Sequence, residues 1–500
     1  MVRLVFFTLF SLMTVAGVAQ DTVTKSRKFF LKLTIDEVIN TARDQSPAAM
    51  LAKFNFVAGY WQYRTYKAEF LPSLNLEASL GTYNRSLSSI QNAETGTFSY
   101  IENNNLSNDL SLSVDQNIAL TGGKLSLSTS LYRIDQFSPY DNHIYNSRPI
   151  SLLYSQPIKA YNTFKWDKIV EPKEFEKVKR VYIENMEAIN INVTKLFFTV
   201  LTAQKSLEMA ENNYAATEQS VKIAENRYKI GSITNSELLQ LKLRLYNDKL
   251  SISDCKMNFE MAMLELRSYL GYNETVNIEL IMPGMGPDIQ LDYTEVLSRA
   301  LNNSSNNLEN ELQIIAARQA VAKAKSNVGL QASFYASFGT TQKGNDLSES
   351  YKNPMDQELL GLSLSLPILD WGLGRGKIKL AKSKEEVVKT QIEQAEAEYR
   401  QNIMIQVLQF NKQGMQCNIS AKADSVARLR YDITMQRFQN GSITVTDLNT
   451  AQTEKDEAVR RYISDLSNYW QYFYTIRKLS LYDFVTKKEI TADFNLLTEN

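Results

Sequence analysis

The sequence contains few of the side chains on which enzyme chemistry usually depends. Its 500 residues include one histidine, His143, and two cysteines, Cys255 and Cys417. Two cysteines are too few for a disulfide scaffold, and both fall in segments with helical periodicity, so we expect free, structural thiols. His143 has no metal-ligand cluster beside it, and the sequence shows neither a phosphate-binding loop nor a nucleophile elbow. We therefore predict no enzyme activity, no metal and no cofactor, and we place His143 in an exposed loop.

The sequence also lacks an excess of charge and, beyond its N-terminus, a long apolar run. Lys and Arg together number 55, as do Asp and Glu, so the net charge is zero and no nucleic-acid partner is indicated. No later apolar run approaches the roughly 20 residues that a membrane helix needs. Only helices and closed barrels satisfy every backbone hydrogen bond inside a bilayer. If the protein lies in a membrane, it must do so as a β-barrel.

The N-terminus has the pattern of a secretory signal. Met1-Val2-Arg3 precedes an apolar run from Leu4 to Val18, and small residues come before Gln20. This pattern predicts a signal peptide over residues 1–19 and an exported mature protein. No cysteine follows the expected cleavage site, so a lipid anchor at that position is not indicated.

One short stretch occurs twice, 210 residues apart. Residues 227–234 read RYKIGSIT, and residues 437–444 read RFQNGSIT. Gly231 and Gly441 supply the left-handed backbone that ends a helix. A threonine follows each glycine, with an acid three residues later, Glu237 in one copy and Asp447 in the other. This spacing is typical of a capping box, so each copy predicts one helix ending and another beginning.

The two stretches belong to a longer duplication. Leu33 corresponds to Leu291, 258 residues later, whereas Pro157 corresponds to Pro367 with the offset of 210. The first half therefore carries 48 extra residues between these points. Each half has the same predicted order of helix, strands, very long helix, glycine turn and shorter helix. We assign residues 20–285 to the first repeat, 286–482 to the second and 483–500 to a C-terminal tail.

Period-two alternation predicts the strands. Leu74 and Leu76 in the first half, and Leu362 and Leu364 in the second, lie on an apolar face opposite serines and an asparagine. A Gly122-Gly123 turn within the extra residues predicts an added hairpin, whose place inside or outside a membrane the sequence leaves open. Repeat one is expected to have four strands and repeat two only two. The expected strands include 73–85, 107–118, 148–158, 329–341 and 358–368, with polar loops at 86–108, 135–147 and 342–357.

Heptad spacing predicts two long antiparallel coiled coils. Residues 172–229 can form one helix of about 87 Å, at 1.5 Å per residue. Its apolar residues recur at intervals of three and four, and the helix after Gly231 repeats this spacing. Cys255 lies on the seam of that return helix and is expected to be a buried small hydrophobe. The second half shows the same pattern less regularly.

Taken together, these features resemble the TolC-like outer-membrane efflux family. The resemblance rests on the two-fold repeat, on the Arg-x-x-x-Gly turns and on the strand edges Leu71-Pro-Ser-Leu-Asn75 and Ser365-Leu-Pro-Ile-Leu-Asp370. It implies an α+β membrane protein with two internal structural repeats, forming a homotrimer. One transmembrane β-barrel, in contact with outer-membrane lipid, would continue into a long antiparallel α-helical coiled-coil barrel in the periplasm of a Gram-negative bacterium.

The resemblance also implies a function and a site. The function would be passive conduction of substrates from a periplasmic adaptor and an inner-membrane transporter to the exterior, in a tripartite efflux or type I secretion system. Asp447 would form a periplasmic gate, although Thr450 departs from the family's second aspartate, and helix capping explains Asp447 locally. A channel-free exported coiled-coil scaffold or surface adhesin is the alternative reading of the heptads. Ile233 and Ile443 are expected to be exposed at the adaptor-docking tip. This tip would comprise Arg227, Gly231, Ser232, Ile233, Thr234, Arg437, Gly441, Ser442, Ile443 and Thr444.

Overall fold

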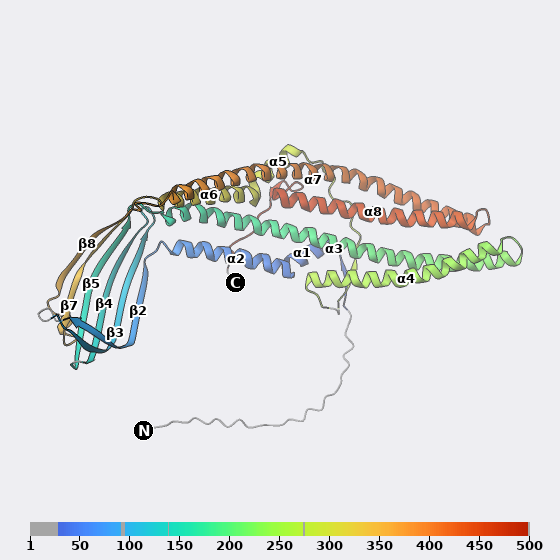
Figure 1. Ribbon diagram of the computed structural model, residues 1–500. Helices are drawn as coiled ribbons and strands as arrows, with labels where there is room; N and C mark the ends of the chain where they lie inside the picture. Colours follow the sequence, from blue (N-terminus) through green and yellow to red (C-terminus); the bar gives the residue numbers. More distant parts are fainter. Residues whose placement is uncertain (1–28, 92–95, 139, 274–275, 499–500) are drawn as a thin grey trace, which may run out of the picture.

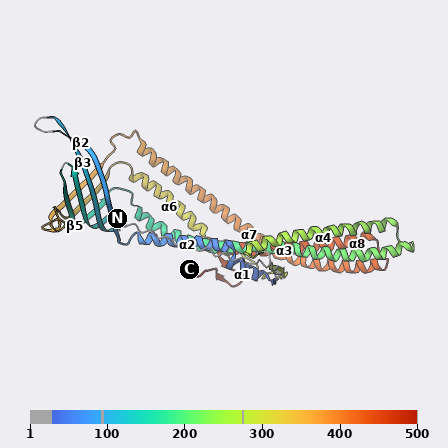
Figure 2. The same ribbon diagram turned by 90° about the horizontal axis from the view of Figure 1, so that it is seen from below.

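The chain is an elongated molecule with a sheet at one end and long helices over the rest of its length (Figure 1). The computed structural model describes residues 29–91, 96–138, 140–273 and 276–498. The predicted signal peptide, residues 1–19, lies outside this part of the chain, as does the centre of the expected loop around Asn92. Figure 2 shows the two helical hairpins running side by side to the far end.

The element order repeats, as the duplication predicts. The first repeat contains α1 (Ile35–Gln45), α2 (Pro47–Ala68), β2 (Ser73–Gln91), β3 (Phe98–Ile118), β4 (Gly123–Ser138), β5 (Asn142–Pro157), α3 (Thr163–Lys229) and α4 (Asn235–Leu270). The second contains α5 (Tyr293–Asn303), α6 (Ser305–Ser326), β7 (Gln331–Gly344), β8 (Met355–Ser365), α7 (Leu373–Gln439) and α8 (Val445–Ser480). The four strands of the first repeat and the two of the second confirm the added hairpin. The exact repeat boundaries stay a prediction.

Local capping explains where the helices begin. Ser46 ends α1 and also caps α2, accepting a hydrogen bond from the Ala49 N–H at 3.1 Å, so the two helices are separated just before Pro47. The long helix α3 begins at Thr163 rather than at Pro172, because the Asn162 side chain caps it by accepting from the Lys165 N–H at 3.1 Å. The proline lies inside the helix instead of starting it.

The six long strands form one antiparallel sheet in the order β2-β3-β4-β5-β7-β8. The strands β2, β3 and β5 extend well beyond the predicted spans, so the loop assignments at 86–108 and 135–147 are wrong for much of their length, whereas most of 342–357 does connect β7 to β8. Gln342 lies within β7, and His143 lies within β5, exposed and opposite Asp135. Backbone pairing does not depend on apolar side chains, and polar pairs such as Arg85 with Asn104 continue the ladder of β2 and β3.

A second, unpredicted sheet joins the repeats near the middle of the molecule. β1 (Phe29–Leu33) pairs in parallel with β6 (Val276–Leu280), which lies in the connection between the two halves. Each strand has five residues, too few for the alternation to stand out in the sequence. Three small elements complete the described fold: η1 (Glu349–Tyr351), β9 (Tyr482–Asp483) and β10 (Lys488–Glu489).

The described part of the chain has two separate hydrophobic clusters. The main cluster lies around α1, α3 and α8 and includes Phe197, Leu266 and Tyr469. The C-terminal segment folds back onto it, with the ring of Phe494 centred 5.1 Å from that of Phe56. The tip cluster lies at the far end of the helices and consists of Val221, Ala224, Leu238, Leu241, Phe438, Val445 and Leu448.

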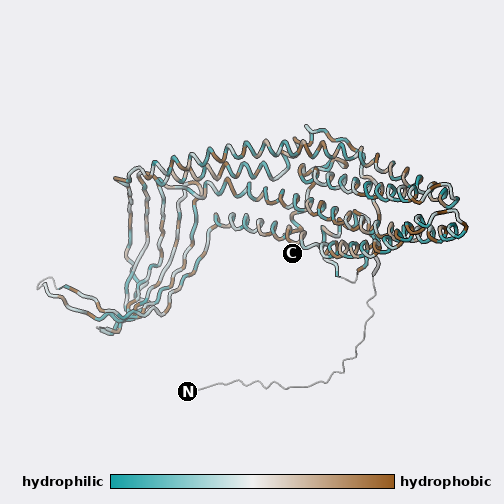
Figure 3. The backbone as a smooth tube through the Cα atoms, turned by 45° about the vertical axis from the view of Figure 1, so that its right-hand side comes forward, coloured by the Kyte–Doolittle hydropathy of each residue, from teal (hydrophilic) through white to brown (hydrophobic). Residues whose placement is uncertain are grey.

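Apolar and polar residues are interspersed along the long helices (Figure 3). None of the helices in the described residues combines the length and apolar character required to cross a bilayer.

Candidate functional site

The two glycine turns have the same backbone geometry. Gly231 and Gly441 have φ values of 74° and 81°, in the left-handed region where only glycine is free of strain. The Ser232 N–H donates to the Arg227 carbonyl at 2.9 Å, and the Ser442 N–H donates to the Arg437 carbonyl at 2.9 Å. This bond satisfies a carbonyl left free by the end of each helix. The sequence prediction of paired helix endings is therefore confirmed.

Both return helices begin with a complete capping box. Thr234 donates its N–H to Glu237 at 2.9 Å and accepts the Glu237 N–H on its hydroxyl at 3.3 Å. Thr444 and Asp447 make the same two bonds at 3.1 and 3.2 Å. Hydrogen bonds from the threonine backbone and side chain lower the pKa of Glu237, and bonds from the Thr444 side chain and backbone lower that of Asp447. Both acids are therefore ionised at neutral pH.

Arg227 joins the two turns into one tip. Its guanidinium donates to the Gln439 carbonyl at 2.9 Å and lies 5.5 Å from the centre of the Phe438 ring. A Cβ on Gly441 would approach the same guanidinium to 2.8 Å, so a side chain there would displace the arginine from its place against this turn. The structure thus brings together residues 212 positions apart that the sequence placed in separate turns.

Ile233 and Ile443 were expected to be exposed, and this expectation is wrong. Both are half-buried and pack against the tip cluster. Each isoleucine directly precedes a helix cap and each helix has a leucine at its fourth position, Leu238 or Leu448, which is the spacing of a hydrophobic staple. That spacing was available in the sequence. The exposed apolar residue of the tip is Ile230, which is 76% exposed.

A polar layer separates the tip cluster from the main cluster. Asn213 of α3 donates to one carboxylate oxygen of Asp456 on α8 at 2.6 Å, and the ammonium of Lys455 lies 3.5 Å from the other oxygen. Thr217 of α3 donates to Asp248 of α4 at 2.6 Å. Asp248 falls at an otherwise apolar seam position, which was the one sequence signal for this layer.

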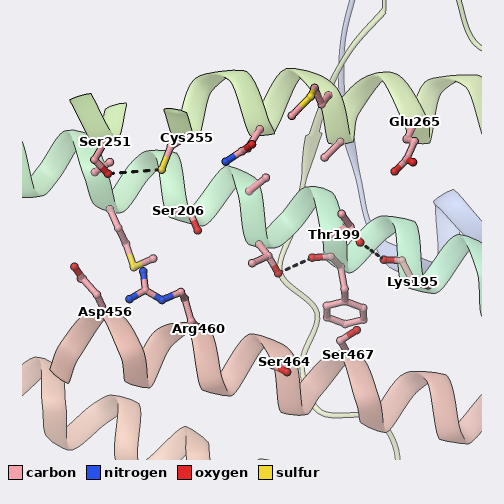
Figure 4. A pocket seen from close by; sticks show the side chains of 18 of the residues that line it. Lys195, Thr199, Ser206, Ser251, Cys255, Glu265, Asp456, Arg460, Ser464 and Ser467 are labelled. Carbon is pink, nitrogen blue, oxygen red and sulfur yellow. Dashed lines mark hydrogen bonds between the residues drawn. The ribbon is translucent and has the colours of Figure 1, made fainter. Parts of the chain in front are cut away.

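An open groove of about 900 Å³ lies beside this layer, between α3, α4 and α8 (Figure 4). Cys255 lines the groove and is half-buried, so its assignment as a buried seam residue was wrong. Cys417 is buried, and burial raises the pKa of its thiol to about 11. Both cysteines are free. No group of three or more metal-ligating side chains occurs within the described ranges.

A sheet joined to long paired helices, built twice from one chain, is the architecture of an outer-membrane channel with a periplasmic helical extension. The chain belongs to the outer membrane efflux protein family, whose model matches residues 111–272 and 296–480. It is an outer-membrane channel of a tripartite efflux system and not an enzyme. This membership replaces the alternative of a channel-free scaffold or adhesin.

Solved channels share the fold over nearly the whole chain. The CmeC outer membrane channel of Campylobacter jejuni is 15% identical, with a TM-score of 0.64 and coverage of 92% of this chain and 88% of that one. The open-state MtrE channel of Neisseria gonorrhoeae is 13% identical, with a TM-score of 0.59 and coverage of 93% and 91%. The outer membrane protein VceC of Vibrio cholerae is 13% identical, with a TM-score of 0.61 and coverage of 89% and 95%. No curated protein matches the sequence.

Proposed function

We propose that the protein works as a homotrimer that receives substrates at its helical tips from a periplasmic adaptor and an inner-membrane transporter. Channels of this family form trimers and pair with an adaptor and a pump. The main support for the trimer is a pair of exposed heptad seams, one on each outer flank of the chain. Within one chain, α3 packs against α4 and α8, and α8 packs against α7, which leaves α4 and α7 at the two flanks.

The exposed apolar residues on these flanks recur at intervals of three, four and seven. On α4 they are Leu239, Leu243, Tyr246, Leu250, Met257, Met261 and Leu264. On α7 the residues with this spacing are Met404, Leu408, Met415, Ile419, Val426, Leu429 and Ile433, preceded by Leu373, Leu380 and Val387 at intervals of seven; Ile405 is exposed outside the seam. This spacing is that of a coiled-coil seam, and α4 of one copy matches α7 of the next in a closed ring.

The two edge strands of the sheet favour the same arrangement, a closed ring of chains. β2 and β8 are the edge strands, and each leaves one row of backbone N–H and C=O groups without a strand partner in the described sheet. Such an edge is costly in lipid, where no water is available to bond these groups. Pairing β2 of one copy with β8 of the next satisfies both edges and closes a barrel.

The helical tips are the proposed docking surface. Ser232 and Ser442 are exposed beside the exposed Ile230, and Arg227 holds the two turns together. Three such tips would give a ring of six turns facing away from the membrane. Helix termination and capping account for the glycines and threonines without a partner, so the test must change side chains that the turns themselves do not use.

The test replaces Ser232 and Ser442 by glutamate together. Their hydroxyls face solvent and their backbone bonds are retained, so a trimer should still form, while six added charges at the tips should abolish transport by the assembled system. Ser383→Glu, at an exposed site on α7 far from the tips, is the matched control. For the double variant only, we expect cells to lose resistance to a toxic substrate of the system, and we expect the channel to lose its cross-link to the adaptor. Normal transport by that variant would refute docking at these tips.

We further propose that Asp447 lines the periplasmic entrance and gates it. Its side chain is exposed at the tip, and three copies around an axis would place three carboxylates near one another. The capping box is a sufficient local reason for an acid at this position, as Glu237 in the first repeat illustrates. The two roles differ in what removal of the charge does to ion flow.

A further inference from the structure

We propose that the added hairpin lies in the channel wall, so that three copies close a barrel of 18 strands whose exit is wider than the helical tunnel that feeds it. The proposal rests on the trimer proposed above. Six strands from each of three copies make 18, whereas two strands from every repeat would make 12. Three observations indicate that β3 and β4 are strands of the channel wall and not an appendage outside it.

First, one apolar row runs unbroken through the first five strands of the sheet. Cross-strand partners place Leu74 of β2 beside Val114, Val114 beside Leu127, Leu127 beside Leu152, and Leu152 beside Phe338 of β7. Glu358 on the edge strand β8 is the charged exception at the end of the row. The added strands therefore share the face that includes Leu362 and Leu364. A charge on a lipid-facing position costs roughly 2–4 kcal/mol at the membrane midplane, so a continuous apolar row marks the lipid side.

Second, the neighbouring row on the opposite face is polar or small across all six strands. It runs through Asn75, Ser113, Ser128, Ser151, Gly339 and Gln357. An appendage folded outside the membrane would have no reason to keep the same two faces in the same register, because a shift of one residue reverses every side chain.

Third, the turn between β3 and β4 is fixed to the helical end of the molecule. The Asn162 side chain, at the start of α3, donates to the Ala119 carbonyl at 3.2 Å. Gln156 of β5 donates to the Thr121 carbonyl at 2.9 Å, and Gln116 donates to the Phe70 carbonyl at 2.9 Å. The added strands thus begin and end at the same levels as their neighbours, as wall strands must.

The consequence concerns the solutes that can leave. Barrel diameter grows roughly linearly with strand number, so 18 strands give a barrel about 1.5-fold wider than 12, in the range where porins keep an open aqueous channel. The polar face is rich in serine, which offers hydroxyls and little bulk. The exit is therefore suited to large hydrated solutes, and the size limit for transport lies in the helical tunnel.

The experiment measures which sizes of polymer can enter the channel through the opening formed by the strands. The purified full chain is inserted in a planar bilayer, and poly(ethylene glycol) of graded size is added on the side of the sheet. A variant lacking residues 98–138, which removes β3 and β4 and joins β2 to β5, is the comparison. The proposal expects the full chain to admit polymers of about 1.5-fold larger radius. An equal size limit would refute the wide barrel, whereas a monomer without conductance would refute the trimer itself.

A second measurement does not depend on the deletion variant folding. In full chains lacking Cys255 and Cys417, a single cysteine replaces either Ser128 or Leu127, adjacent residues of β4 on opposite faces. In proteoliposomes, a water-soluble maleimide should label Ser128→Cys inside the channel and leave Leu127→Cys unlabelled against lipid. Labelling of both would place β4 in water on both faces and would refute its position in the wall.

Discussion

At the scale of single residues, Asp447 has two explanations with different consequences. As a gate, it contributes negative charge to the entrance of the proposed trimer. We therefore expect Asp447→Asn to change cation selectivity or block by divalent cations in planar bilayers, while Glu237→Gln, its counterpart in the first repeat, leaves both unchanged. Equal conductance in the two variants, with a similar loss of thermal stability, would reduce Asp447 to a helix cap.

The cap itself has a pH signature. The carboxyl pKa values of Asp447 and Glu237 are lowered in the folded chain, so the stabilisation is fully present above about pH 4, where the unfolded carboxyls ionise. It is lost as the pH falls through the lower folded values. The melting temperature of the unmodified protein should fall as the pH is lowered below about 4, and by less in the Asn and Gln variants.

These residues also show which parts of the site the sequence could predict. The glycine turns and capping boxes depend on residues within five positions of one another, so the repeated octapeptide and the acid that follows it predicted them correctly. The Arg227 bond to Gln439 joins residues 212 positions apart and could only be seen once the two hairpins were placed together. The burial of Ile233 was readable from local spacing, and the error came from treating a turn residue as exposed.

At the scale of elements, a buried ion pair fixes α8 against α3. Arg477 donates to both oxygens of Glu187 at 3.2 and 3.3 Å and to Asp483 at 2.7 Å, and Glu187 is fully buried. Removing one partner of such a pair leaves an uncompensated buried charge. Glu187→Ala leaves Asp483 as the remaining acid bonded to Arg477, so it should destabilise the protein, but by less than the roughly 3–5 kcal/mol of a fully uncompensated buried charge.

The double variant Glu187→Leu with Arg477→Met is the control. It removes both buried partners, and Asp483 keeps the N–H bonds from Val485 and Thr486 at 2.9 and 3.2 Å. Denaturant unfolding followed by helix circular dichroism should show a smaller loss for the double variant than for Glu187→Ala. An equal or larger loss would mean that packing, not the loss of the Glu187 charge beside Arg477, determines the cost.

Element types were predicted better than element lengths. The strands β2 and β3 continue to Gln91 and from Phe98 through polar residues, because an antiparallel ladder is made by the backbone and needs an apolar face only where lipid or core covers it. A sequence analysis that takes polarity as the sign of a loop ends such strands too early.

At the scale of the whole molecule, the exposed apolar residues on α4 and α7 determine whether the proposed trimer forms. Leu243 on α4 and Met415 on α7 are 62% and 66% exposed in the single chain, and the proposed trimer buries them. Burying such a side chain contributes roughly 1.5–3 kcal/mol, repeated at three interfaces. Leu243→Glu or Met415→Glu should therefore shift the protein from trimer to monomer in native mass spectrometry. Gln240→Glu, exposed on α4 beside but outside the seam, should stay trimeric; a trimer in all three variants would place the interface elsewhere.

The equal lengths of the helices have a consequence for how this molecule can change over time. α3 and α7 each have 67 residues, and α4 and α8 each have 36. Inserting one residue in α7 alone would turn everything beyond it by about 100° and advance it by about 1.5 Å, breaking the seams. An insertion of seven residues preserves the seams. If it were made in α7 and α8 only, however, the Gly441 turn would extend about 10 Å beyond the Gly231 turn, and Arg227 would lose its contact with Gln439. The four helices must therefore change length together. Related proteins that span a wider or narrower periplasm need matching insertions or deletions in both halves of the gene.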